Sequence, residues 1–120
     1  MRRIVLSIVV LSTLACGGNS SDSPITTPPV VTPVATSSVN VNDNTFSPEA
    51  AEISINAPLT WTWQGAAQHN VTFEDGKESS GTKAAGTHSR TFATAGTYRY
   101  RCTIHSSGFS SGMVGSVVVQ

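Results

Sequence analysis

Apolar and polar residues alternate in several short stretches of the chain, and such alternation is typical of β-strands with one buried face. Val39 and Val41 alternate with asparagines and predict a first strand, which a turn at residues 42–44 ends. Ile53 and Ile55, separated by a serine, predict a second strand. This part of the chain therefore indicates sheet rather than helix.

The alternation continues to the end of the chain. Side chains two positions apart on a strand point to the same face, so each alternating set predicts one buried face. Residues 77–89 lack a clear period, which predicts a loop with a short edge strand. The alternating sets are Leu59, Trp61 and Trp63; His69, Val71 and Phe73; and Tyr98, Tyr100 and Cys102, followed by the β-branched run GSVVVQ at 115–120.

No helical period of about 3.6 residues is sustained over three turns. Many short strands, separated by Gly, Pro and Asn, predict an all-β fold of the Greek-key β-sandwich type. Aromatic side chains at alternating strand positions are interpreted as packing in the core or at the edge of this sandwich. They are Trp61, Trp63, Tyr98 and Tyr100.

The N-terminal part of the chain has a different composition. Residues 1–15 join two arginines to an apolar stretch too short to span a bilayer, which predicts a signal peptide and export. Cys16 ends a pattern that resembles a bacterial lipobox, which predicts a lipid anchor on Cys16; ordinary cleavage near Ala15 is the alternative. Residues 16–37 are rich in Gly, Ser, Thr and Pro and predict a disordered tether, or else a processing remnant without a function. We therefore expect a periplasmic or cell-surface protein anchored to a membrane.

Length and charge limit the remaining possibilities. A chain of 120 residues makes one domain, which we place at residues 38–120 and expect to be a monomer. Seven basic and seven acidic residues leave a formal net charge of zero. No broad basic surface is therefore available for phosphate backbones, and nucleic acid is excluded as a partner.

Four residues in the second half of the chain carry possible metal donors. If Cys16 carries lipid, Cys102 has no cysteine partner, and a free thiol in an oxidising compartment must be buried or bound to metal. His69, Cys102, His105 and Met113 supply two imidazoles, a thiol and a thioether. This is the donor set of a blue-copper electron-transfer site. Each residue alone is more often a core or surface residue, so the prediction depends on their combination and spacing.

Over about residues 39–120 the chain resembles the cupredoxins of the plastocyanin, halocyanin and pseudoazurin group. The resemblance rests on the pair HN at 69–70 and on CTIH at 102–105, followed by GMVG at 112–115. It implies one type 1 copper ion bound by His69, Cys102 and His105, with Met113 as the weak axial ligand. It also implies that Asn70 ties the two ligand loops together, and that electrons pass through the edge of His105 to transient redox partners.

The chain departs from this family pattern at two places. Seven residues, SSGFSSG, separate His105 from Met113, where the family usually has two to four. A longer loop can still close, because each doubling of its length costs only about 0.6 kcal/mol. Gln68 stands where many relatives have proline. Phe109, in the long loop, is a candidate shield for the metal or part of an apolar docking surface, and His88 is interpreted as a surface residue.

Together these features predict a blue-copper electron carrier outside the cytoplasm, and not an enzyme. Copper storage or delivery is the alternative, although delivery proteins more often use flexible segments rich in methionine or histidine, which this chain lacks. A copper oxidase or nitrite reductase needs additional histidine-rich centres, and only His88 is left. A structural zinc site with the same ligands is a further alternative, which an intense blue colour with Cu(II) would exclude.

Overall fold

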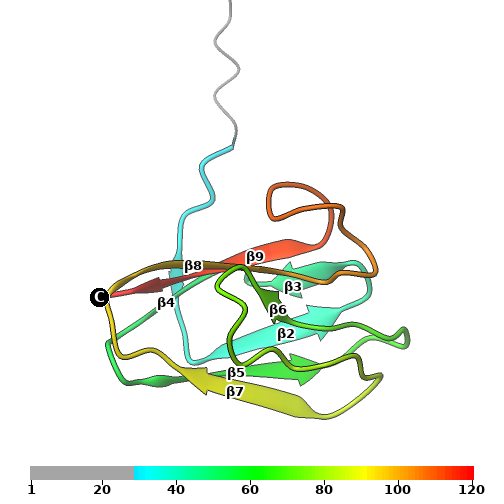
Figure 1. The fold of residues 1–120 in the computed structure, drawn as a ribbon, viewed down its shortest axis with the longest axis horizontal. Helices are drawn as coiled ribbons and strands as arrows, with labels where there is room; N and C mark the ends of the chain where they lie inside the picture. The colour runs from blue at the N-terminus through cyan, green and yellow to red at the C-terminus, as the bar shows by residue number, and fades with distance from the viewer. Residues whose placement is uncertain (1–28) are drawn as a thin grey trace, which may run out of the picture.

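The structure, a computed structural model, describes residues 29–120 as two mixed β-sheets packed face to face (Figure 1). The five-stranded sheet has the order β1-β4-β9-β8-β6, and the four-stranded sheet has the order β3-β2-β5-β7. The all-β sandwich predicted from the alternation is therefore confirmed. The strands are β1 (Val34–Ala35), β2 (Ser38–Asn42), β3 (Thr45–Ser47), β4 (Ala50–Ile53), β5 (Pro58–Trp63), β6 (Thr72–Phe73), β7 (Thr87–Thr91), β8 (Gly96–Arg101) and β9 (Val114–Val119).

The predicted signal peptide, Cys16 and most of the predicted tether lie outside the described residues. The last residues of the predicted tether are part of the sandwich, because Val34 and Ala35 form β1 and pair in parallel with β4. Within residues 29–120 no helix is long and apolar enough to cross a membrane.

The alternation places the predicted core residues correctly on β2 and β5. These two strands run parallel, with Val39 opposite Trp61 and Val41 opposite Trp63. Both valines and Trp61 are fully buried, and Trp63 is 7% exposed. Alternate side chains of these strands therefore face the second sheet, as the period of two requires.

The predicted second strand is wrong in its position. β4 ends at Ile53, and Ile55 is 43% exposed. After Ile53 the backbone turns, because the N–H of Ala57 donates to the carbonyl oxygen of Ser54 at 3.0 Å and Asn56 has a φ of 63°. The two isoleucines thus belong to different elements. The buried face of β4 is made by Ala51 and Ile53 instead.

Tyr100 on β8 is the centre of the aromatic core. Its ring makes edge contacts with Phe46 at 4.8 Å and Trp61 at 5.3 Å between centroids, and a tilted contact with Phe73 at 5.5 Å. Each such pair contributes about 0.5–1.5 kcal/mol beyond its buried area. Because Tyr100 lies two residues before Cys102, this packing fixes the end of β8 from which Cys102 follows.

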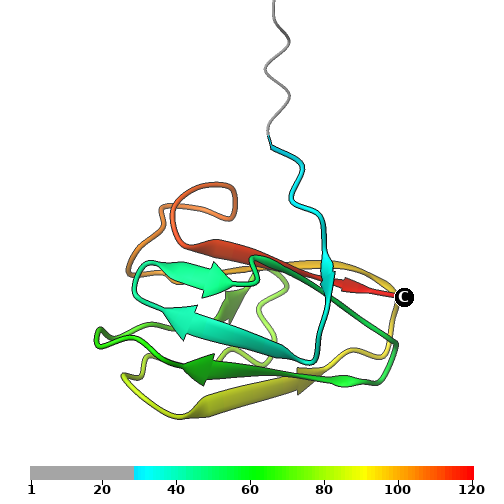
Figure 2. The same ribbon diagram turned by 180° about the vertical axis from the view of Figure 1, so that it is seen from behind.

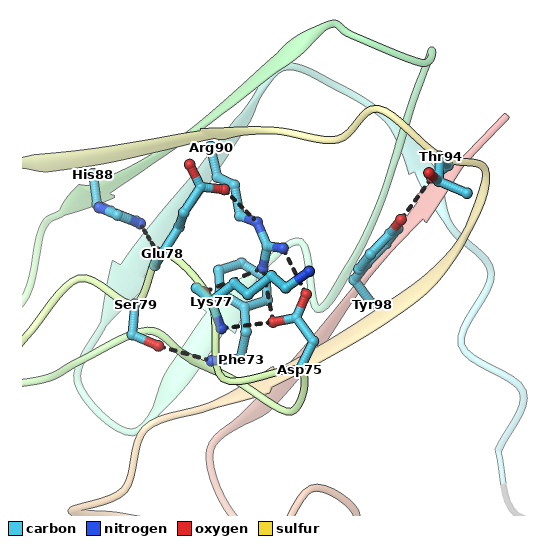
Figure 3. Close-up of polar contacts among 9 residues, drawn as sticks. All are labelled: Phe73, Asp75, Lys77, Glu78, Ser79, His88, Arg90, Thr94 and Tyr98. Atoms are coloured by element: carbon cyan, nitrogen blue, oxygen red, sulfur yellow. Dashed lines mark hydrogen bonds and ion pairs between the residues drawn. The ribbon is translucent and has the colours of Figure 1, made fainter.

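A polar cluster lies on one flank of the sandwich, around Arg90 on β7 (Figure 3). Arg90 is only 6% exposed, and its Nη2 contacts Asp75 Oδ2 at 2.6 Å. Its Nε lies 3.0 Å from Glu78 Oε2, without the alignment of a hydrogen bond. The guanidinium also covers the rings of Phe73 and Phe92, with Cζ at 4.3 and 4.6 Å from their centroids. The positive charge of Arg90 is therefore both paired and packed.

Three connections meet at the end of the sandwich opposite the C-terminus (Figure 1). They are the turn between β2 and β3, the connection from β5 to β6, and the two ends of the long connection from β8 to β9. Every predicted metal donor lies on the last two of these connections, because Met113 directly precedes β9. The sandwich thus gathers residues that are up to 44 positions apart in the sequence, from His69 to Met113.

Candidate metal centre

Three predicted donor atoms converge at this end of the sandwich. The Nδ1 atoms of His69 and His105 are 3.1 Å apart, and the Cys102 Sγ atom lies 3.8 Å from the first and 3.6 Å from the second. His69 is held by reciprocal backbone hydrogen bonds of 3.0 Å with Lys83. His105 is placed by a turn, in which its N–H donates to the Cys102 carbonyl at 3.3 Å. Within residues 29–120, these three residues form the group that could hold a metal.

The spacing of the three donors fits a trigonal metal ion. An ion about 2.0 Å from each nitrogen and about 2.3 Å from the sulfur would separate nitrogen from sulfur by about 3.7 Å, and the two nitrogens by about 3.5 Å. The observed nitrogen–sulfur distances of 3.8 and 3.6 Å agree with this, and the nitrogens are slightly closer at 3.1 Å. Two imidazoles and one thiolate in a plane are typical of blue-copper sites.

Met113 lies beside these donors despite the long loop. The Cys102 N–H donates to the Met113 carbonyl at 3.0 Å, and the Met113 N–H donates to the His105 carbonyl at 3.1 Å. Gly112 makes this closure possible, because its φ is 84° and a Cβ there would lie 2.5 Å from the His105 carbonyl oxygen. Met113 is 2% exposed and belongs to the core cluster. The hydrogen bond between Met113 and His105 thus closes the loop at its base, and the extra residues lie within the loop, between these two positions.

Asn70 connects the two ligand segments. Its Nδ2 donates to Thr103 Oγ1 at 2.9 Å and to Thr82 Oγ1 at 3.2 Å. Its Oδ1 accepts from the N–H of Thr103 at 3.0 Å and from the hydroxyl of Thr72 at 2.9 Å. Asn70 is 4% exposed, so its end of these bonds is buried, although Thr82 and Thr103 are exposed. The segment after His69 and the segment after Cys102 are therefore fixed relative to each other.

Comparison with known proteins agrees with this geometry. Residues 34–120 match the family described as copper binding proteins, plastocyanin/azurin family. The chain belongs to this family. A plastocyanin from Scenedesmus fuscus is 30% identical to it over 87 residues, which cover 62% of this chain and 86% of that protein.

Solved cupredoxin structures share the fold. A purple cupredoxin from Nitrosopumilus maritimus superposes with a TM-score of 0.59 at 22% identity, over 71% of this chain and all of the other. The reduced state of an amicyanin variant gives a TM-score of 0.59 at 28% identity, over 77% of this chain and 95% of the other. The chain is therefore a cupredoxin, and copper is its cofactor.

Sequence reasoning missed one residue beside the donor set of this cupredoxin, Asp43. Its Oδ1 lies 3.1 Å from Nε2 of His69, on the side of the ring away from Cys102. The N–H of Ala67, the His69 ring and the N–H of Ala66 together lower the pKa of Asp43 to about 2. The sequence indicates only a turn at 42–44, because nothing in the local pattern shows that Asp43 meets a histidine 26 residues later.

The predicted ligands differ in exposure. His69 and Cys102 are fully buried, whereas His105 is partly exposed. Ile104, next to His105, is 51% exposed. The imidazole of His105 is therefore the part of the donor set that lies nearest to solvent.

Phe109 and His88 lie apart from the donor set. The Phe109 ring packs on the guanidinium of Arg101, with Cζ 5.0 Å from the ring centroid, and lines a surface groove with Val31. The loop that carries Phe109 rises beside residues 29–33, which Figures 1 and 2 show from opposite sides.

His88 lies on β7 rather than in a loop, and is partly buried with its ring 6.0 Å from Trp61. Its Nε2 contacts the carbonyl oxygen of Glu78 at 2.7 Å.

Proposed function

We propose that this cupredoxin carries single electrons on a copper ion that His69, Cys102 and His105 would hold, with Met113 as a weaker fourth ligand. The convergence of the two Nδ1 atoms and the Sγ atom, all within 4.8 Å of one another, carries the proposal. When bound, copper supplies a one-electron couple between Cu(II) and Cu(I). The thiolate and the two imidazoles hold the ion, and the rest of the chain holds these ligands.

The ligand segments have the rigidity that a carrier needs. Electron transfer is fast when the donors move little between the two oxidation states. The backbone of His69 is fixed by Lys83, and that of Cys102 by Met113. Asn70, which is itself buried, connects the two segments through its side-chain hydrogen bonds. These contacts support a carrier over copper delivery, which requires ligands that can open.

We propose His105 as the route of the electron to a partner. Its imidazole is the partly exposed ligand, and the exposed Ile104 lies beside it. A partner that docks here approaches the ligand set without displacing the buried His69 or Cys102. Such redox encounters are expected to be small and transient. Replacing His105 by alanine is expected to weaken copper binding and to abolish rapid electron exchange, measured by stopped-flow with a small redox protein. Unchanged exchange in this variant would reject His105 as the route.

We also propose that the protein works outside the cytoplasm, as a monomer anchored through lipid on Cys16. The apolar segment at 4–14 and the lipobox-like sequence before Cys16 support this location. Mass spectrometry of the mature protein from a bacterial host tests it. A diacylglycerol-modified N-terminal cysteine is expected, whereas an unmodified N-terminus near residue 16 would show ordinary cleavage.

The absorption and electron spin resonance spectra of residues 29–120 loaded with Cu(II) test the proposed ligand set. We expect an intense visible band from charge transfer between the Cys102 thiolate and Cu(II), which Cys102→Ala abolishes. Ser111→Ala, in the exposed part of the long loop, is the matched control and keeps the band. A colourless protein that binds zinc more tightly than copper would contradict the proposal.

Copper delivery is distinguished from electron transfer by the fate of the metal. The wild-type protein is cycled repeatedly between oxidant and reductant in the presence of a strong Cu(I) chelator. A carrier is expected to keep its copper and its visible band through the cycles. Rapid loss of copper to the chelator upon reduction would favour delivery.

A further inference from the structure

The Asp43 carboxylate is held in a fixed position at the far edge of the His69 ring. Its Oδ1 accepts from the Ala67 N–H at 2.9 Å, and its Oδ2 accepts from the Ala66 N–H at 3.1 Å. The remaining contact of Oδ1 is with Nε2 of His69 at 3.1 Å. The carboxylate therefore bridges the β2–β3 turn and the segment that carries the histidine.

The local backbone is shaped around this carboxylate. Asp43 and Asn44 make the two-residue connection between β2 and β3, and Asn44 takes a φ of 63°, which asparagine tolerates better than most residues. Gly65 lies directly against Asp43, so that a Cβ at position 65 would come within 2.3 Å of Asp43 Oδ1. A residue with a Cβ at position 65 would collide with the carboxylate, so the glycine there makes room for the contact.

The contact determines which nitrogen of His69 carries the hydrogen. An ionised carboxylate only accepts hydrogen bonds, so the shared hydrogen lies on Nε2 of His69. Nδ1 then has its lone pair free, and this is the nitrogen that faces Cys102 Sγ and His105 Nδ1. Carboxylates placed in this way behind a metal-bound histidine fix the tautomer and the orientation of its ring, and make the ring a stronger donor.

We propose that Asp43 is a positioning residue for the copper centre, which orients His69 and stabilises the oxidised ion through its negative charge. The proposal rests on the role of His69 as a ligand proposed above. Cu(II) carries one more positive charge than Cu(I), so a nearby carboxylate and a more basic imidazole both favour Cu(II). Asp43 therefore lowers the reduction potential of the centre.

Two substitutions separate the charge of Asp43 from its hydrogen bond. Asp43→Asn removes the charge but keeps an oxygen that can accept from His69 and Ala67. Asp43→Ala removes both the charge and the acceptor. Glu49→Gln is the matched control, because it removes one negative charge from an exposed residue that is outside the donor set. All variants are made in the full-length chain and compared at one pH and ionic strength.

The reduction potential of the copper-loaded proteins is measured by voltammetry. Asp43→Asn is expected to raise the ratio of reduced to oxidised protein about tenfold at a fixed solution potential, which corresponds to about 59 mV. Asp43→Ala is expected to give at least the same shift, and also to weaken Cu(II) binding about 10- to 100-fold in a chelator competition. Glu49→Gln is expected to leave both quantities within about twofold of wild type.

Nitrogen NMR of the metal-free proteins reports the tautomer directly. In the wild type and in Asp43→Asn, the hydrogen of His69 is expected on Nε2, whereas Asp43→Ala is expected to show a mixture of tautomers. Potentials of both variants equal to wild type, or a wild-type hydrogen on Nδ1, would overturn the proposal. Failure of the proposed electron-carrier function can be told apart from failure of the Asp43 proposal, because the copper-loaded wild-type protein would then lack the visible thiolate band. In that case the NMR result still decides whether Asp43 holds the ring.

Discussion

Two polar clusters of this protein each contain a histidine and acidic side chains, but their atoms are matched differently. Around Arg90, the guanidinium contacts the carboxylates of Asp75 and Glu78, and His88 contacts the Glu78 carbonyl. At the end of the sandwich, the Nδ1 atoms of His69 and His105 face each other and the sulfur of Cys102. In the first cluster a cation meets acceptors, whereas the second brings together three atoms that can each donate an electron pair to a metal.

This difference separates a structural cluster from a binding site. A guanidinium between carboxylates is already neutralised and hydrogen-bonded, so it needs no further ion. Three electron-pair donors that face one point repel one another unless a proton or a metal lies between them. The convergence of three possible ligand atoms therefore indicates metal binding, and the mere presence of a histidine near acidic residues does not.

The largest effect is expected from Asn70→Ala, which breaks the connection between the ligand segments. The substitution removes four partly buried hydrogen bonds, each of which contributes about 1 kcal/mol, and leaves the Thr103 N–H without its acceptor. We expect the free energy of unfolding to fall by about 3 kcal/mol and copper binding to weaken. Urea unfolding of the metal-free protein and chelator competition measure the two effects. Thr82→Val removes one of these bonds and serves as the control, with a loss of about 1 kcal/mol.

A smaller effect, confined to stability, is expected from Arg90→Ala. The variant loses the buried ion pair with Asp75 and the packing on Phe73 and Phe92. Since Asp75 and Glu78 are 30% and 61% exposed, water can reach both carboxylates, and we expect a loss of about 2 kcal/mol rather than the about 3–5 kcal/mol of a fully buried pair. Arg99→Ala, which breaks an exposed pair with Glu74, is the control and should cost less than about 1 kcal/mol. A changed copper spectrum in Arg90→Ala would contradict the division between the two clusters.

The smallest effect on the free energy of unfolding is expected when acid protonates Asp75 in the Arg90 cluster. The hydrogen bond from Arg90 lowers the pKa of Asp75 below its ordinary value of 3.8. The ionised form of Asp75 therefore stabilises the fold at pH values above 3.8, and this contribution is lost as the pH falls through the lowered pKa. Unfolding of the metal-free protein at pH 5 and pH 2.5 is expected to show a decrease, and the decrease should be smaller in Arg90→Ala. Because the pair is partly exposed, the difference should stay within about 1 kcal/mol. Equal decreases in the free energy of unfolding of the two proteins would show that Asp75 does not stabilise the fold through its pair with Arg90.

The sequence is sufficient to predict the two-layered fold and the three donors that converge at the site, His69, Cys102 and His105. Alternation at Val39, Val41 and Trp61 reports burial directly, because a strand with one buried face repeats every two residues. The rarity of cysteine and histidine in this chain makes the spacing of Cys102 and His105 informative.

Contacts between distant turns could not be predicted in the same way. Asp43 reaches His69 only because β2 and β5 lie side by side in parallel, which brings the ends of both strands together. Similarly, the pattern around Ile55 is that of a strand, but the backbone turns after Ile53. Such features depend on the three-dimensional path of the chain, and the local sequence carries little information about them.

The short β1 strand has a mechanical consequence for the copper centre. β1 is joined to β4 by two residue pairs, whereas β8 and β9 share six. A pulling force on the N-terminal segment would separate β1 from β4 first, because this pairing is the shorter one. The force would then act on β2, while the β8–β9 ladder stayed intact. A pull on the N-terminal segment would therefore be absorbed at β1 before it strained the backbone at Cys102 or Met113.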